Sequence, residues 1–159
     1  MLRYSALVSV PVVFVCVLAV GQAPPSYGPS VGIETAKKVA SVALGEAQKN
    51  HWFMAVAVVD TSGTLVYYEK MDNTQTGSAR VAIEKARTAA LYKRPSKMFQ
   101  DMVAGGGSGL RILGLPDAVP IEGGVPLIVD DKIVGAIGVS GAAADQDGIC
   151  ANAGANSLK

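Results

Sequence analysis

The sequence is poor in the residues that most catalytic, metal and nucleic-acid sites require. Its 159 residues include one histidine and two cysteines, 6% of them are aromatic, and the net charge is +1. A single histidine excludes a multi-histidine metal centre. Few aromatic side chains and almost no net charge argue against stacked bases and a phosphate backbone as partners, so we expect no nucleic-acid partner.

Recognisable catalytic and nucleotide-binding motifs are also missing. The sequence contains no Walker pattern, and the glycine-rich run 105–109 does not have the spacing of a dinucleotide fingerprint. No paired carboxylates and no Ser-His or Cys-His arrangement can be identified, which argues against ordinary hydrolysis. A binding protein is therefore favoured over an enzyme, and Lys85 is the one candidate for a catalytic residue.

Residues 1–23 have the layout of a secretory signal peptide. Arg3 precedes an apolar run from Ala6 to Val20, and small residues follow the run. The run is short and contains Pro11, so a permanent membrane span is the weaker alternative, and we expect none after cleavage. The pattern predicts an exported protein, located in the periplasm or outside the cell.

The remainder of the chain is predicted to be a proline-containing linker at residues 24–32 and one folded domain at residues 33–157. Half of all residues are hydrophobic, which is enough for a core. Once the signal is removed, Cys150 is the remaining cysteine. It cannot form an internal disulfide, and we expect a small buried apolar residue there.

Helical and strand patterns alternate within this domain. Apolar residues recur at helical spacing over 33–50 and 78–92, whereas 53–59, 64–68, 125–129 and 132–139 are short apolar runs typical of strands. The turn residues at 60–63 and at Asp130-Asp131 predict two hairpins. A short helix is expected from Pro95 to Met102, and the run 105–109 is expected to be a flexible surface loop.

The last predicted strand runs directly into a helix start at residues 140–147. Asp145 and Asp147 suit the positive first turn of a helix, which can be an ordinary capped start or an anion site. Lys85 borders the apolar stripe of helix 78–92. We predict that it faces a pocket at residues 140–143 and that its ammonium has an anionic or carbonyl partner.

Several short motifs occur in a fixed order along the domain: Ala57–Asp60 with Gly63, Met71-Asp72, Lys85–Ala90, Pro95, Gly123–Pro126, Gly135–Gly141 and Gln146-Asp147. In these motifs the chain resembles the GlcG/HbpS family, over roughly residues 33–155. The resemblance implies an α/β, profilin-like fold, with a five-stranded antiparallel sheet, helices packed on both faces, and assembly into homo-oligomers. It also implies haem (heme) as the cofactor.

Three functions are compatible with these observations. The first is an exported haem-binding protein that acts in haem uptake, buffering, sensing or degradation. The second is an accessory factor or enzyme for a small organic acid such as glycolate, with Lys85 acting near Gly123-Gly124. The third is a non-catalytic oligomeric binding scaffold. The export signal favours haem over a cytoplasmic acid pathway, and the expected partner is haem or another small anionic ligand.

Candidate cofactor-binding residues are drawn from the basic stretch after helix 78–92 and from two isolated positions: Lys85, Tyr92, Lys93, Arg94, Ser96, Lys97, Met98 and His51. The cations are expected to pair with haem propionates, and the apolar side chains to cover the porphyrin. His51 and Ser96 are the candidate ligands of the haem iron. Histidine is a frequent haem ligand, and the resemblance places a hydroxyl residue linked to haem at Ser96.

Overall fold

The computed structural model describes residues 24–159, so the predicted signal peptide lies outside the described residues. The elements follow the order β1 (Ser26–Tyr27), α1 (Ile33–Lys49), β2 (Ala55–Val59), β3 (Leu65–Lys70), α2 (Ser78–Tyr92), α3 (Ser96–Ala104), the 3-10 helix η1 (Gly107–Gly114), β4 (Gly124–Val129), β5 (Lys132–Ser140) and α4 (Ala144–Asn156). The predicted helices and hairpins are therefore confirmed, to within a few residues at their ends.

Strand β5 is the centre of a five-stranded sheet. It pairs with β4 along one edge and with β2 along the other, and β2 pairs in turn with β3. These pairings are antiparallel. Asp130 and Asp131, with φ of 49° and 58°, form the tight β4–β5 turn that the sequence predicts.

The prediction of an entirely antiparallel sheet is wrong, because β1 pairs with β5 in parallel. Strand β5 has nine residues and β2 has five, so β2 reaches only Ala136–Ser140. The first part of that β5 edge is left for another strand, and Ser26–Tyr27 takes it opposite Lys132 and Ile133. A strand thus lies within the segment expected to be a linker. The likeness to the profilin fold stays a prediction.

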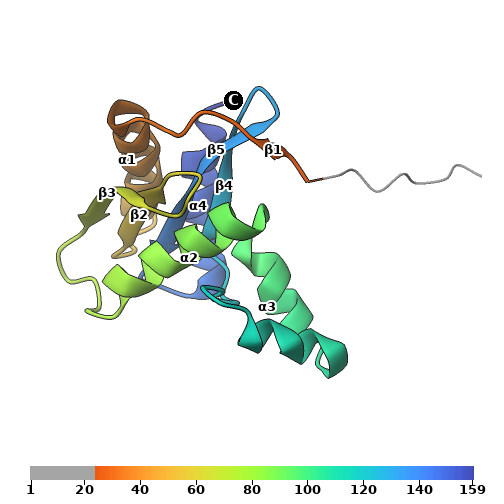
Figure 1. Ribbon diagram of the computed structural model, residues 1–159. Helices are drawn as coiled ribbons and strands as arrows, with labels where there is room; N and C mark the ends of the chain where they lie inside the picture. The colour runs from red at the N-terminus through yellow and green to blue at the C-terminus, as the bar shows by residue number, and fades with distance from the viewer. Residues whose placement is uncertain (1–23) are drawn as a thin grey trace, which may run out of the picture.

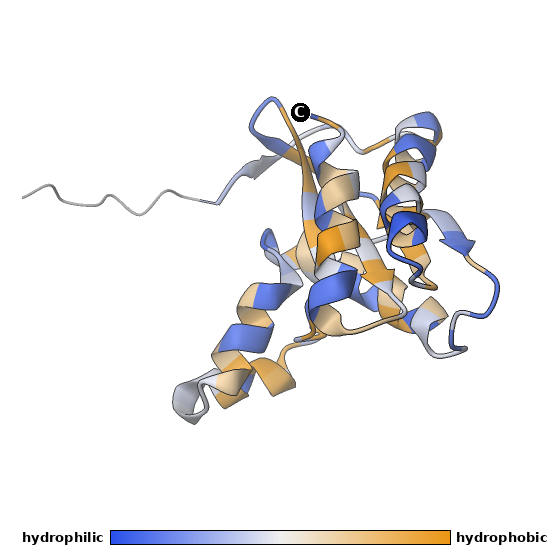
Figure 2. Ribbon diagram, turned by 180° about the vertical axis from the view of Figure 1, so that it is seen from behind, coloured by the Kyte–Doolittle hydropathy of each residue, from blue (hydrophilic) through white to orange (hydrophobic). Residues whose placement is uncertain are grey.

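Helices cover both faces of the sheet, with α2 on one face and α1 and α4 on the other (Figure 1). The face toward α1 and α4 carries large apolar side chains, including Val56, Val58 and Ile137. The apolar residues of the sheet lie between the helix layers, while the outer sides of the helices are more polar (Figure 2). The core therefore has separate parts on the two faces of the sheet.

The face toward α2 carries alanine and glycine in place of large side chains. Ala55 and Ala57 of β2 pack against Ala82 of α2, and a Cβ placed at Gly138 would clash with the Ala82 carbonyl oxygen. Small residues on both surfaces let the helix backbone lie almost directly on the sheet. This close approach fixes where the side chains at the edges of α2 can reach.

Helix α3 and η1 extend away from the sheet as an arm (Figure 1). The sequence predicted a flexible loop at residues 105–109, and this prediction is wrong for its second half, where η1 begins at Gly107. Gly106 and Gly107 adopt positive φ of 66° and 54°. The Gly109 N–H then donates to the Gly106 oxygen at 2.9 Å, which allows the chain to turn back along α3.

Among residues 24–159, no helix combines the length and the apolar character needed to cross a membrane.

Cys150 is fully buried in α4, as the sequence predicts, and burial raises the pKa of its thiol to about 11. Below that pH the sulfur stays protonated, and a thiol is a far weaker nucleophile than a thiolate. We expect Cys150 of the native protein to resist iodoacetamide at pH 8 and to react once the chain is unfolded in urea. Peptide mapping by mass spectrometry distinguishes it from Cys16. Equal labelling of Cys150 in both states would contradict its burial.

Candidate functional site

The Lys85 side chain forms a buried ion pair that joins three elements. From α2, its Nζ lies 2.6 Å from Oδ2 of Asp147 in the first turn of α4, and it donates to the Val139 carbonyl oxygen of β5 at 3.2 Å. The Lys85 and Asp147 side chains are 1% and 3% exposed. The predicted partners of the ammonium, one anionic and one carbonyl, are therefore confirmed.

Asp147 is positioned by the start of α4 as well as by Lys85. Its Oδ1 accepts the Ala142 N–H at 3.1 Å, at the end of the strand-to-helix junction. Burial lowers the pKa of Lys85 and raises the pKa of Asp147, and the mutual attraction of the two charges opposes both shifts. Each charge is stable in this position because the other is present.

The space around the pair is filled. A Cβ at Gly123 would lie 2.9 Å from both the Lys85 Nζ and the Asp147 Cβ. Gly123, with φ of 126°, thus provides the room that the ammonium occupies. The predicted proximity of Lys85 to the Gly123-Gly124 loop is confirmed, but the ammonium is enclosed by protein atoms and bound to Asp147. This arrangement suits a structural link better than a ligand site.

Removing one partner of this pair should be costly, because the other charge would stay buried and unpaired. We expect Lys85→Met to lower the free energy of unfolding by about 3–5 kcal/mol, measured by urea denaturation. Lys85→Met combined with Asp147→Leu should recover most of that loss, since two apolar groups leave no unpaired charge.

Lys37→Met is the matched control for this prediction. The Lys37–Glu34 pair lies on the surface, with side chains 51% and 83% exposed, and such pairs contribute about 0–1 kcal/mol. If Lys85→Met cost no more than Lys37→Met, the buried pair would not hold the three elements together.

A cleft of about 330 Å³ opens between α3 and α4. Its floor is β4, an edge strand that pairs only with β5 among the described strands, and it contributes Val125, Pro126 and Ile128. The other lining residues come from the chain before α1, from the start of α3 and from the C-terminal part of the chain: Pro25, Lys93, Arg94, Pro95, Met98, Asn152, Ala155, Asn156 and Lys159. The cleft therefore combines an apolar floor with three cations and no carboxylate side chain.

Three of the eight predicted cofactor-binding residues, Lys93, Arg94 and Met98, line this cleft. Lys93 is the left-handed C-cap of α2, and its ammonium lies 4.2 Å from the centre of the Tyr27 ring. The Arg94 Nε donates to the Tyr92 carbonyl oxygen at 3.0 Å, which fixes its guanidinium near the Phe99 ring.

Lys97 and Tyr92 do not line the cleft. The Lys97 Nζ contacts both carboxylate oxygens of Asp101, at 2.9 and 3.1 Å, and lies 3.8 Å from Glu122, so its charge is already neutralised. The Tyr92 hydroxyl donates to the Pro116 carbonyl oxygen, and its ring packs edge-on against Phe99. Tyr92 therefore connects the end of α2 to the arm, whereas the Lys97–Asp101 pair lies within α3.

Ser96 is fully buried and protects the open edge of β4. Its hydroxyl donates to the Ile121 carbonyl oxygen at 2.7 Å and accepts the Gly124 N–H at 2.8 Å. The Glu122 N–H is bound in the same way by the side-chain oxygen of Gln100 at 2.8 Å. Pro126 has no N–H group that needs a partner. The side chains from α3 and this proline together complete the hydrogen bonding along this part of the sheet edge.

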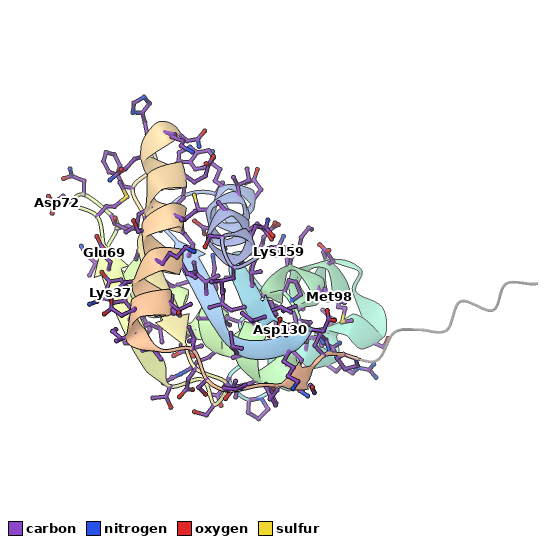
Figure 3. All side chains as sticks on the ribbon, turned by 90° about the horizontal axis from the view of Figure 1, so that it is seen from above. Lys37, Glu69, Asp72, Met98, Asp130 and Lys159 are labelled. Carbon is purple, nitrogen blue, oxygen red and sulfur yellow. The ribbon has the colours of Figure 1, made fainter. Side chains whose placement is uncertain are left out.

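His51 lies on a different side of the molecule from the cleft. It is exposed just after α1, between Gln48 and Phe53, which line a separate hollow with Glu69 and Asp72. Figure 3 labels Glu69 and Asp72 on one side of the molecule and Met98 on the other. The structure therefore does not bring His51 together with the basic stretch.

Sequence reasoning missed the wall of the cleft formed by Asn152, Asn156 and Lys159, and its floor at Pro126 and Ile128. The basic run 93–97 is visible in the sequence, but α4 has few large apolar residues and no recognisable pattern on that side. One signal was available. A proline within a strand pattern indicates an edge strand, and an edge strand beside a cationic helix start is a place to look for a cleft.

The mixed α/β fold and this arrangement of elements are shared with solved structures. A double mutant of HbpS from Streptomyces reticuli is 27% identical, with a TM-score of 0.76, covering 91% of this chain and 98% of the other. The crystal structure of a PduOC haem complex is 25% identical, with a TM-score of 0.73, covering 82% of this chain and 96% of the other.

Sequence comparison defines the family. A family model described as haem degrading protein, HbpS-like, matches residues 31–156. Protein GlcG of Escherichia coli is 39% identical over 107 residues, which are 67% of this chain and 78% of GlcG. The chain belongs to the HbpS-like family, and the resemblance to the GlcG/HbpS group is confirmed.

Proposed function

We propose that the protein binds haem in the cleft between α3 and α4. The observation that carries this proposal is the composition of the cleft, in which an apolar floor from β4 is combined with Lys93, Arg94 and Lys159. A porphyrin presents two apolar faces and two propionates, and guanidinium and ammonium groups are the usual partners of carboxylates. No carboxylate side chain among the lining residues would repel the propionates.

The cleft is large enough to enclose part of a haem molecule. Its volume of about 330 Å³ is near the lower end of the range of about 300–1,000 Å³ that is typical of ligand pockets. A ligand as large as haem would be held along one part and exposed along the rest. Such an arrangement suits uptake, buffering or sensing, in which haem must be released again. The iron, when haem is bound, would supply the redox chemistry.

The relatives support the proposal in general terms. The description of the matching family model names haem degradation, and PduOC was solved as a haem complex. The lining of the cleft supports haem binding, and the proposal concerns that step and not degradation. We also propose that binding takes place outside the cytoplasm, because residues 1–23 have the pattern of a cleaved secretory signal.

A small organic acid is the second candidate ligand, and the identity to GlcG favours it. Lys85 was the residue expected to serve such an acid, but Asp147 neutralises its charge and the side chain is 1% exposed. A small acid would therefore also have to use the cations of the cleft. Competition by glycolate in a haemin titration distinguishes the two candidates.

Charge reversal at the cleft should weaken haem binding. We expect haemin to bind the wild-type protein saturably, with a shift of the Soret band, and Arg94→Glu to weaken it about tenfold or more. The loss of one charge-assisted contact is worth about 1.5–3 kcal/mol, and about 1.4 kcal/mol corresponds to a factor of ten.

Lys97→Glu is the control, because it makes the same change of charge three residues further along, outside the cleft. Lys97→Glu should bind haemin within about twofold of wild type, once both variants have been shown to melt as cooperative folded proteins. Equal weakening by the two substitutions would mean that only net charge matters. A titration like that of an unrelated protein of similar charge would contradict haem binding altogether.

We further propose a homo-oligomer, on a different basis from that expected from the sequence. The alanine-rich stripes of α1 and α2 do not supply an interface, because residues such as Ala40 and Ala86 are fully buried within the subunit. Among the exposed apolar side chains, two lie close together in sequence on the arm, where Leu110 is 50% and Leu113 is 64% exposed. A second copy of the chain would cover them.

Light scattering tests this assembly. We expect the wild-type protein to give a mass of several subunits, and Leu110→Glu with Leu113→Glu to reduce it, because two charges would have to be buried. Ile149→Glu, a change on α4 at a site 49% exposed, is the control. A single-subunit mass for the wild-type protein would contradict the proposal.

A further inference from the structure

The ligand that holds haem iron has to come from a short list of side chains. Proteins use histidine, methionine, cysteine thiolate or tyrosine as axial ligands. Of these four residue types, the cleft is lined by methionine alone, at Met98. Its other polar side chains are the amides of Asn152 and Asn156 and the cations of Lys93, Arg94 and Lys159. A protonated ammonium or guanidinium has no lone pair to give to a metal.

Four further side chains that carry a donor oxygen or sulfur, those of Ser96, Tyr92, Tyr27 and Cys150, are committed elsewhere. The Ser96 hydroxyl is buried between Ile121 and Gly124, and the Tyr92 hydroxyl is bound to Pro116. The Tyr27 hydroxyl donates to the carbonyl oxygen of Ala90 at 2.9 Å. Cys150 is fully buried in the core.

Met98 has both the position and the freedom to act as a ligand. Its N–H donates to the Pro95 oxygen at 3.0 Å, so its backbone is fixed in the first turn of α3. Its side chain is 44% exposed at the cleft, and an unbranched thioether adapts its rotamers readily. The Sδ atom can therefore approach a ligand without movement of the helix.

We propose that the Met98 thioether is an axial ligand of the haem iron. The proposal rests on the haem-binding function proposed above, and it replaces His51 and Ser96 as candidate iron ligands. Thioether sulfur is a soft donor, which favours the reduced iron, and methionine ligation raises the reduction potential of haem. Bound haem should therefore be held more firmly as ferrous than as ferric haem.

Helix α3 contains a matched control for this proposal. Met102 lies one helical turn beyond Met98 and is 40% exposed, but it lines a different hollow with Asp101 and Ser108. Met98→Leu and Met102→Leu make the same change of side chain at nearly equal exposure on one helix. Both substitutions conserve volume at exposed positions, so both variants should fold as the wild-type protein does.

The test compares haemin binding, visible spectra and reduction potential for the wild-type protein, Met98→Leu, Met102→Leu and Met98→His. Wild type and Met102→Leu should share one spectrum and one potential. Met98→Leu should shift the visible bands of the ferrous state, lower the potential, and weaken ferrous binding more than ferric binding. Met98→His should restore ligation with a different spectrum, because an imidazole nitrogen replaces the sulfur.

The failure of this inference differs from the failure of the proposed function. Saturable haem binding with the same spectrum and potential in wild type and Met98→Leu would show that Met98 is not a ligand, while the cleft would remain the binding site. The absence of saturable haemin binding in the wild-type protein would overturn both proposals.

Discussion

The close packing of α2 on the sheet is the constraint on which the rest of the structure depends. Ala55, Ala57 and Gly138 leave no large side chain between the helix and the strands, so the two backbones lie very close together. Lys85, at the border of the buried face, therefore cannot reach solvent and extends to Asp147 instead. These small residues thus place Lys85 where it forms a buried ion pair, and the ion pair in turn holds the start of α4 in position.

The same packing determines where the cleft lies. Helix α2 ends at Tyr92, and Lys93 turns the chain in a left-handed conformation toward α3. Helix α3 is then attached to the edge of β4 by Ser96, while α4 covers the opposite face of the sheet beside that edge. The cleft is the space between these two helices. Two of its three cations, Lys93 and Arg94, come from the turn after α2, and its apolar floor comes from a strand that has no further strand partner in the described chain.

The sequence predicts the regular elements well, because each has a strong local signal. The helical spacing of the alanines predicts α1 and α2, and the turn residues Asp130-Asp131 predict the β4–β5 hairpin. The parallel strand β1 could not be foreseen, since two residues carry no periodicity and pair only because β2 is shorter than β5. The 3-10 helix after Gly106 was hidden for a similar reason, as glycine-rich runs are typical of loops.

The sequence identifies part of the lining of the cleft, but it does not show which of the predicted residues remain available in the folded chain. The basic run of Lys93 and Arg94 is visible in the sequence and lines the cleft. Lys97 belongs to the same run, but Asp101 lies one turn away on α3 and neutralises it. Ser96 resembles an accessible hydroxyl in the sequence, yet the fold uses it to satisfy the edge of β4. Which side chains remain available is decided by contacts made in the folded chain, within α3 for Lys97 and with β4 for Ser96.

Binding of haem in the cleft between α3 and α4 is tested most directly by mapping of backbone amide shifts. Zinc protoporphyrin, which is diamagnetic, can be titrated into the isotopically labelled protein for this purpose. We expect saturable shifts at Met98 and Ile128 and in the last turn of α4, with little change around His51. Shifts centred on residues 48–73, or no saturable shifts at all, would contradict it.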